Sequence, residues 1–344
     1  MKRSDKQLSK NQVLVRTLLG VLALAVAIFA IVKFADKLIE DEEPREQRQS
    51  IDESSVRLNR IQYNGVTYVE NPDITTILIL GVDKDDKTQI DGYRNGGQAD
   101  FILLVAVDAA NNTVSRLQID RDTVTEIPNM SVLGKRIGTR TGQVALAHNF
   151  GATPEENNAY TVESVQALLE GAVKVDVCTS FYLGGISEFN DALGGVPVKI
   201  EDDFSAFSDA MPIGETVTLQ GSQAELFTRS RSGVGQQTNE ERMKKRQAAY
   251  MTSALDIMIK KCREDANFAM GLLDSMFEGN YFVSSVSTGR LVNEINAALG
   301  CTILPTEYIE GSGKVGLQGF MEFTPREDWI TEWVLRTYYV QENR

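Results

Sequence analysis

Residues 75–123 read TTILILGVDKDDKTQIDGYRNGGQADFILLVAVDAANNTVSRLQIDRDT. The segment opens with an unbroken apolar run at residues 75–80, which is typical of a strand covered on both faces of a sheet. A polar, glycine-rich loop separates this run from a second one at residues 101–107. The sequence AANN then forms a turn into a third strand at residues 113–119. The segment therefore predicts three strands of a buried sheet.

Strand and helix patterns alternate further along the chain. We expect helices at residues 159–172 and 185–193, and strands at 173–182 and 196–200. The pattern then becomes helical, with a short helix through Phe227, a long one from about 239 to 261, and further helices at 268–277, 288–299 and 324–339. Trp329 and Trp333 share one face of the last of these. The alternation predicts an α/β fold whose central mixed β-sheet is flanked by helices.

The N-terminal region predicts a membrane anchor. Residues 13–34 read VLVRTLLGVLALAVAIFAIVKF, roughly the length needed to cross a hydrocarbon core of about 30 Å. Arg16 and Lys33 lie near its ends, where their stems can reach the headgroups. Basic residues precede the run and acidic residues follow it, so the N-terminus should be cytoplasmic and the remainder outside the cell. A cleaved signal peptide ending near Ala25 and Ala27 is the alternative, but the apolar run continues beyond them.

Composition excludes several classes of function. The 344 residues carry 35 Lys and Arg against 48 Asp and Glu, a net charge of -13, which argues against a nucleic-acid-wrapping protein. Any anion site must therefore be a local cluster of arginines. Three scattered cysteines form neither a disulfide framework nor a thiolate metal site. The single histidine, His148, excludes a three-histidine zinc centre and is expected to pack or hydrogen-bond within its helix.

Two carboxylates border the glycine-rich loop. Asp83 follows the first strand and Asp100 precedes the second, at the edge of the sheet where α/β proteins commonly bind ligands. Hard oxygen ligands suit Mg²⁺, which takes one or two protein carboxylates and completes its shell with water and phosphate; Mn²⁺ would be accepted as well. The alternative is a solubilising loop in which Asp83 is a turn residue.

Arginines cluster at three further places. Arg121 and Asp122 follow the third strand, where the guanidinium could bind phosphate and the carboxylate could orient it, although an internal salt bridge is also possible. In the sequence FTRSRS, an extended backbone would project Arg229 and Arg231 to one side, which favours a bound anion between them. The long helix carries arginines at positions 242 and 246 on one face, either toward a ligand or toward solvent.

The order of these motifs resembles the LytR-CpsA-Psr family. The resemblance covers roughly residues 75–256 and rests on six segments. These are ILILGVD, QADFILLVAVDAANNTVSRLQIDRDT, VALAHNFG, FNDALGGVPVKI, LQGSQAELFTRSRSG and NEERMKKRQ. It implies a three-layer α/β domain behind one signal anchor, in a single-pass protein of a Gram-positive bacterium with its catalytic domain outside the cell membrane.

The implied activity is a phosphotransferase reaction. A glycan phosphate, such as teichoic acid or capsular polysaccharide, would pass from a polyprenyl-pyrophosphate donor to peptidoglycan, with no nucleic acid involved. Phosphoryl transfer needs charge neutralisation and positioning more than a special nucleophile. Carried over by position, the resemblance implies that Asp83 and Asp100 lie near the metal. It places Arg121, Arg229, Arg231, Arg242 and Arg246 around the pyrophosphate with Gln247, and makes Asp122 or Asp100 the group that assists deprotonation.

The sequence departs from the family pattern at three places. Gln98 stands where the family has an arginine, Ala145 stands where it has an asparagine, and the final arginine spacing is one residue longer. Arg94 is the candidate to replace the missing arginine and bind substrate. Two alternatives follow, a hydrolase that cleaves the lipid pyrophosphate with water and a non-catalytic, membrane-tethered protein that binds glycan or regulates.

These patterns divide the chain into five parts. We expect a cytoplasmic tail, a transmembrane anchor, a charged extracellular stalk, a catalytic domain and a C-terminal helical extension that packs on that domain. Their bounds are residues 1–12, 13–34, 35–60, 61–265 and 266–344, respectively.

Overall fold

The computed structural model describes residues 58–342 except 91, 231–239, 266–267, 269–271, 273–277, 288–289, 292–296 and 318. At residues 240–244, 262 and 263 it describes the backbone alone. The predicted anchor and nearly all of the predicted stalk lie outside the described residues. Within the described part of the chain, no helix is both long enough and apolar enough to span a membrane.

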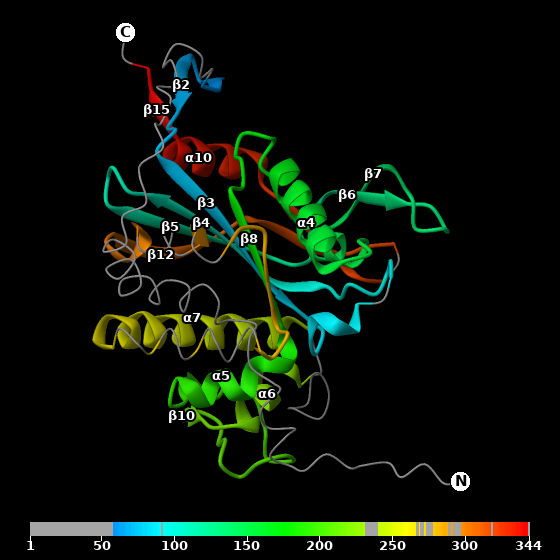
Figure 1. Cartoon of the computed structure of the whole chain (residues 1–344), viewed down its shortest axis with the longest axis vertical. Helices are drawn as coiled ribbons and strands as arrows, with labels where there is room; N and C mark the ends of the chain where they lie inside the picture. The colour runs from blue at the N-terminus through cyan, green and yellow to red at the C-terminus, as the bar shows by residue number, and fades with distance from the viewer. Residues whose placement is uncertain are drawn as a thin grey trace, which may run out of the picture.

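Six strands form the central sheet in the order β11-β8-β3-β4-β5-β12 (Figure 1). Their bounds are β3 Ile74–Val82, β4 Ala99–Asp108, β5 Thr113–Ile119, β8 Val177–Tyr182, β11 Phe282–Ser284 and β12 Thr302–Tyr308. β3 pairs antiparallel with β4 and parallel with β8, and β5 pairs antiparallel with β4 and parallel with β12. The mixed sheet predicted from the sequence is confirmed.

Helices cover both faces of this sheet (Figure 1). Side chains alternate along β3, so that Ile77 and Ile79 enter one core while Leu78 and Leu80 enter the other. The first core is closed by α5 (Ile186–Ala192), α6 (Ser222–Arg229) and α7 (Glu240–Glu264). The second is closed by α4 (Pro154–Leu168) and α10 (Glu327–Tyr338). The unbroken apolar runs are therefore strands buried on both faces, as expected.

Four small sheets surround the central one. β1 (Arg60–Tyr63), β2 (Val66–Glu70) and β15 (Tyr339–Gln341) join the two ends of the described chain. The second small sheet is the antiparallel pair β9 (Val196–Lys199) and β10 (Thr216–Leu219). Two hairpins complete the set, β6 (Val124–Met130) with β7 (Arg136–Gln143) and β13 (Gly311–Val315) with β14 (Met321–Pro325).

The expected C-terminal helical extension is wrong in one respect. β11 and β12 form the two edges of the central sheet, so residues after 265 complete the sheet as well as packing on it. The strand signal was weak because β11 has three residues and β12 contains Pro305. Proline is tolerated at an edge strand or a bulge, and the register of β12 shifts between Ile303 and Thr306.

Candidate active site

Arg121 lies at the junction of three sheet strands. It follows β5 closely, and the antiparallel register pairs Ile119 of β5 with Ile102 of β4, so the guanidinium reaches the start of β4. Its Nη1 donates to Asp100 Oδ1, its Nη2 donates to Gln98 Oε1, and its Nε lies 3.7 Å from Asp122 Oδ1. Two carboxylates and an amide therefore fix a buried arginine at the sheet edge.

Asp122 is buried at the base of the two hairpins. Gln143 at the end of β7 donates from Nε2 to Asp122 Oδ1 at 2.8 Å and to the Met321 carbonyl oxygen at 2.7 Å. The backbone N–H of Phe323 donates to the Asp122 carbonyl oxygen at 2.9 Å. With 2% of its surface exposed, Asp122 is placed to orient Arg121.

Asp83 closes the glycine-rich loop onto the start of β4. Its Oδ1 accepts from the Gln98 backbone N–H at 2.5 Å, and its own N–H donates to the Gln98 carbonyl oxygen at 3.0 Å. Asp83 and Asp100 therefore lie at neighbouring strand ends, as the sequence predicted.

Two carboxylates match what Mg²⁺ takes from a protein, because phosphate and water supply the remaining ligands. Asp100, however, also balances the charge of Arg121. Among the described residues, no three His, Cys, Asp or Glu side chains gather closely enough to hold a metal ion by themselves. The donor chemistry thus fits a metal that is bound largely through its substrate.

His148 contacts the backbone of the glycine-rich loop. The imidazole Nδ1 lies 3.1 Å from the Gly96 carbonyl oxygen and 3.4 Å from that of Gly97, and Nε2 lies 3.2 Å from the Asn158 side-chain amide. A Cβ on Gly96 would lie 2.3 Å from the His148 carbonyl oxygen, so this close approach requires glycine. His148 therefore bonds to a distant loop and to α4 instead of within its own short helix, and it lies outside the Arg121 cluster.

Arg229 is the last residue of α6, so the expected extended segment is wrong at this position. Ala224 and Phe227 bury one face of the helix, and the Thr228 hydroxyl donates to the Ala224 carbonyl oxygen, which keeps the backbone helical through Arg229. The Arg229 Nη1 donates to Glu225 at 2.8 Å and to Asp85 at 3.3 Å. The half-exposed guanidinium thus joins α6 to the acidic loop after β3. Arg231 lies outside the described residues.

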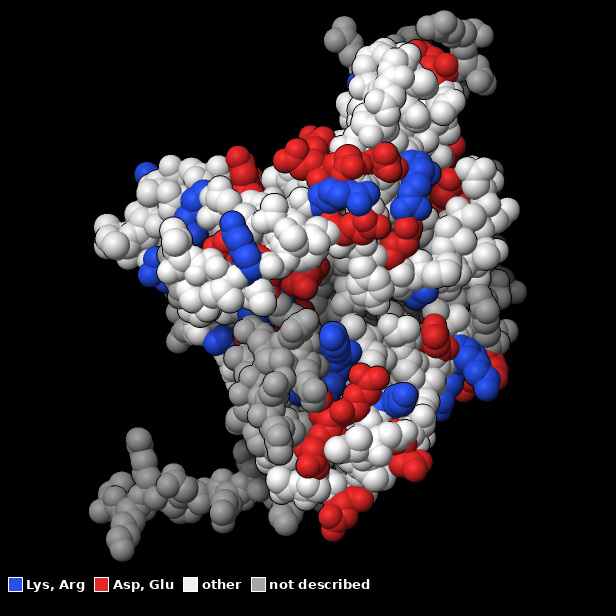
Figure 2. All heavy atoms as spheres, turned by 180° about the vertical axis from the view of Figure 1, so that it is seen from behind, with Lys and Arg blue, Asp and Glu red and all other residues white. Residues whose placement is uncertain are grey.

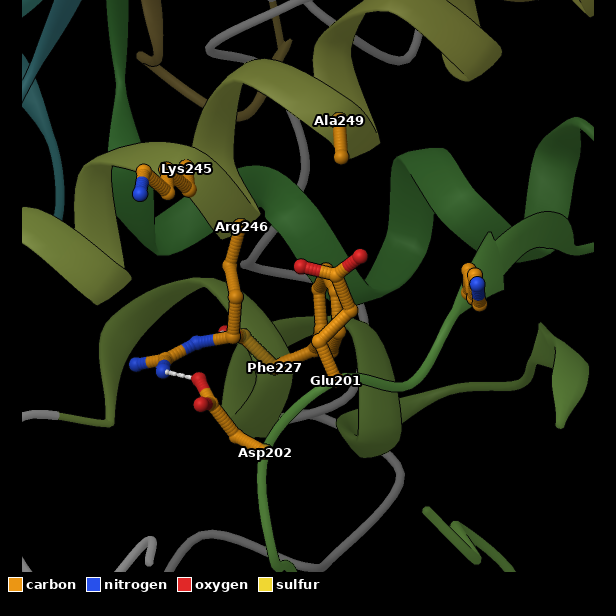
Figure 3. A pocket seen from close by; sticks show the side chains of 7 residues that line it. Glu201, Asp202, Phe227, Lys245, Arg246 and Ala249 are labelled. Atoms are coloured by element: carbon orange, nitrogen blue, oxygen red, sulfur yellow. Dashed lines mark hydrogen bonds and ion pairs between the residues drawn. The ribbon is translucent and has the colours of Figure 1, made fainter. Parts of the chain in front are cut away.

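Arg246 and Gln247 diverge from adjacent positions on α7. The guanidinium of Arg246 pairs with Asp202, donates from Nε to the Phe227 carbonyl oxygen at 2.7 Å, and donates from Nη2 to the Ser230 carbonyl oxygen. Figure 3 shows this side chain reaching away from α7 toward Asp202. The prediction that Arg246 surrounds the pyrophosphate with Arg121 is not supported by this geometry; Arg246 instead holds the end of α6.

Gln247 lies toward the other side. Its Nε2 donates to the Thr228 carbonyl oxygen at 3.2 Å, and the residue lines the same cavity as Asp100. In the described part of the chain, its buried Oε1 has no hydrogen-bond partner. The sequence prediction placed Arg242 on this helix too, and the structure describes its backbone alone, in the first turn of α7.

Arg94 lies near the tip of the β6–β7 hairpin, next to Tyr93. Its side chain is exposed and its guanidinium lies 5.1 Å from the centroid of the Tyr93 ring. The Tyr93 hydroxyl in turn donates to the Val132 carbonyl oxygen at 3.5 Å. The place that the family gives to an arginine is filled by Gln98 itself, which accepts a hydrogen bond from Arg121.

A cavity beside Asp100 was not foreseen from the sequence. It lies between the ends of β3, β4 and β8 and the helices α5 to α7, and the space in it that a water molecule can enter is about 30 Å³. Its lining is mostly apolar and consists of Gly81, Asp100, Phe101, Phe181, Leu183, Ile186, Thr228, Gln247, Tyr250 and Met251. Residues from five separate segments meet there, so no local pattern could reveal it. The site therefore combines a fixed arginine, two carboxylates and an apolar recess.

Comparison with known proteins identifies relatives of part of the chain. The polyisoprenyl-teichoic acid–peptidoglycan teichoic acid transferase TagU of Bacillus subtilis (strain 168) is 28% identical over 183 residues, or 53% of this chain and 50% of TagU. TagU of Halalkalibacterium halodurans is 24% identical over 228 residues, or 65% of each chain. The chain thus spans about half the length of the first relative and 65% of the second.

Solved structures share the fold. TagT bound to LI-WTA superposes with a TM-score of 0.55 at 17% identity, over 77% of this chain and 90% of TagT. Bacillus subtilis TagV gives 0.54 at 19% identity, over 78% and 96%. The sequence model of the LytR_cpsA_psr family matches residues 28–276, which is more than half of the chain, and the chain therefore belongs to this family.

Proposed function

We propose that the chain transfers a glycan phosphate from a polyprenyl-pyrophosphate-linked donor to peptidoglycan. The observation that carries the proposal is the placement of Arg121, fixed by Asp100 and Gln98, beside an apolar cavity that Asp100 also lines. A lipid-linked pyrophosphate needs a cationic environment for the phosphates and an apolar one beside it for the isoprene units, and the recess of about 30 Å³ would have to widen to admit such a unit. The relatives named above as teichoic acid transferases agree with this chemistry.

We propose the following reaction at these residues. An acceptor hydroxyl attacks the glycan-linked phosphorus, a new P–O bond forms, and the bond from that phosphorus to the bridging oxygen breaks. The lipid phosphate leaves with the electron pair, and the hydroxyl proton passes to a carboxylate. Asp100, which lines the cavity, is the candidate for that carboxylate where it is not a metal ligand, and Asp122, which accepts from Gln143, is the second candidate.

The arginines neutralise charge during this step. Arg121 cannot turn away because its neighbours fix it, so it requires little reorganisation when charge builds on the phosphates. Arg229, at the end of α6, donates a hydrogen bond to Asp85 in the acidic loop after β3. Gln247 has an amide at the cavity for a further polar contact. We propose that Arg231 and Arg242 add to this set.

We also propose that Mg²⁺ or Mn²⁺ serves as cofactor, with Asp83 and Asp100 as its protein ligands. When bound, the metal would neutralise phosphate charge and orient the donor. On this proposal Asp100 is shared between the metal and Arg121.

Residues 13–34 are proposed to anchor the protein in the cell membrane, with the N-terminus in the cytoplasm and the catalytic domain outside.

The experiment is a transfer assay on the full chain with a radiolabelled polyprenyl-pyrophosphate oligosaccharide, Mg²⁺ and oligomeric peptidoglycan. Label should appear on peptidoglycan, and a chelator should abolish the transfer until Mg²⁺ is restored. Label released as soluble glycan phosphate, equally with and without peptidoglycan, would identify a hydrolase instead. Donor that is retained on the protein but unchanged would identify a binding protein.

A further inference from the structure

Two β-hairpins project side by side from the Arg121 end of the domain (Figure 1). The β6–β7 hairpin begins just after Asp122, and the β13–β14 hairpin is joined to its base by a bridge between Thr123 and Phe323. The hydrogen bond from Gln143 to the Met321 carbonyl oxygen adds a second connection. The two hairpins are therefore joined to each other and to the segment that holds Arg121.

The ends of both hairpins expose large apolar side chains. In the first, Val132, Leu133 and Ile137 are 87%, 91% and 62% exposed. In the second, Val315, Leu317 and Phe320 are 67%, 108% and 63% exposed. We call these six side chains the apolar tips. Scattered exposed apolar residues are common, but such side chains gathered on adjacent projections indicate a surface that something covers.

Basic residues lie near the first of the apolar tips. Residues 130–140 contain Lys135, Arg136 and Arg140 and no acid, whereas Lys314 of the second hairpin pairs in register with Glu322 of β14. Arg136 pairs with Glu163 at 2.7 Å, whereas Lys135, Arg140 and Lys314 are exposed. In Figure 2 the corresponding lobe, at the upper left, ends in white and blue. Apolar tips with a basic rim are complementary to an anionic lipid surface.

The first tip also contacts the glycine-rich loop. The Tyr93 hydroxyl donates to the Val132 carbonyl oxygen at 3.5 Å, and a Cβ on Gly134 would lie 2.8 Å from Tyr93 Cδ1. That loop leads to Gln98, which binds Arg121. The first tip is therefore connected through the glycine-rich loop to the candidate active site.

We propose that the apolar tips insert into the interface of an anionic lipid bilayer and that Lys135 and Arg140 bind its headgroups. The contact is separate from the predicted anchor at residues 13–34, and it holds the glycine-rich loop and Arg121 at headgroup depth. The insertion does not depend on the transfer reaction, because it rests on exposure and charge alone.

The test uses tryptophan as a depth reporter in the full chain. Leu133→Trp and Phe320→Trp place it in each tip, and Val340→Trp places it on the exposed strand β15, on a different part of the surface (Figure 1). Spectra of the parent chain, which contains Trp329 and Trp333, are subtracted. The vesicles contain phosphatidylglycerol with phosphatidylcholine, or phosphatidylcholine alone, with lipids brominated along the acyl chain as quenchers.

On anionic vesicles, both tip reporters should shift to the blue and lose intensity to the brominated lipid, and Val340→Trp should do neither. Adding Lys135→Glu and Arg140→Glu to the Leu133→Trp chain should reduce the loss. Tip emission that brominated lipid leaves unchanged overturns the proposal. So does a tip-dependent dimer of the lipid-free protein in light scattering, because the tips would then bind a second copy of the chain.

Discussion

Two buried arginines have different roles in the structure. Arg121 and Arg246 each pair with an aspartate, and each is less than one-tenth exposed. Arg121 lies at the sheet edge beside the apolar cavity, whereas Arg246 donates its hydrogen bonds to Asp202 and to two carbonyl oxygens at the end of α6. The resemblance to the family placed both around one pyrophosphate; the direction of each side chain separates them.

His148 should make stability depend on pH. Burial lowers its pKa to about 4, and the neutral ring donates from Nδ1 to the Gly96 carbonyl oxygen. Nε2 then needs a donor, which the Asn158 amide provides when its Nδ2, otherwise without a partner, faces the ring. The unfolded chain takes up a proton near pH 6.5 and the folded chain does so only near pH 4. The free energy of unfolding should therefore fall across this window by up to about 3 kcal/mol.

The measurement is urea unfolding of the parent and of His148→Gln between pH 7 and pH 4. Glutamine keeps a donor for the Gly96 carbonyl oxygen but does not titrate. The variant should lose less stability than the parent as the pH falls. Parallel curves for the two proteins would show that His148 is not buried in its neutral form.

At the scale of elements, the sequence predicted the buried strands well and the connections poorly. β3, β4 and β5 appear within two residues of the expected bounds, because long apolar runs leave few alternatives to a covered strand. The helix that ends at Arg229 was expected to stop at Phe227, and the two missed residues changed the geometry assigned to the arginine. The hairpins β6–β7 and β13–β14 gave no usable alternation, since their exposed tips are apolar.

The end of α6 should depend on the buried ion pair. Arg246→Met leaves Asp202 without its guanidinium and removes two bonds to carbonyl oxygens, so we expect a loss of about 3–5 kcal/mol of unfolding free energy. Combining it with Asp202→Asn should cost clearly less than the sum of the two single changes, because no charge then remains buried. Urea unfolding of all four proteins measures the cycle. Additive losses would mean that the two side chains do not interact in solution.

At the scale of the whole molecule, the C-terminal region belongs to the fold. Its edge strands complete the central sheet, and α10 places Trp333, which is fully buried, in the second core. The sequence showed the helix and both tryptophans on one face, and the structure confirms that Trp329 packs against the same core. It could not show that β12 returns to pair in parallel with β5, because that pairing joins segments 189 residues apart (Thr113 to Thr302).

Removing Trp333 should therefore destabilise the entire domain. Trp333→Ala should cost about 3–5 kcal/mol, since it deletes a buried ring and the hydrogen bond from Nε1 to Glu307. Trp329→Ala, at a partly buried position of the same helix, should cost less. Unfolding followed by circular dichroism measures both. Two small and equal losses would indicate that α10 packs only loosely, as a dispensable extension would.

The central claim is that Arg121 stabilises charge on the transferred phosphate. It is tested most directly by the initial rate of label transfer to peptidoglycan by Arg121→Lys, with Arg336→Lys as the matched control. Arg336 pairs with Glu307 on the exposed side of α10, away from the cavity. The rate should fall about a hundredfold or more for Arg121→Lys, because lysine lacks the planar fork whose two terminal nitrogens bond Asp100 and Gln98 separately, and should stay near the parent value for the control. Equal rates for the two folded variants would contradict the assignment of the active site.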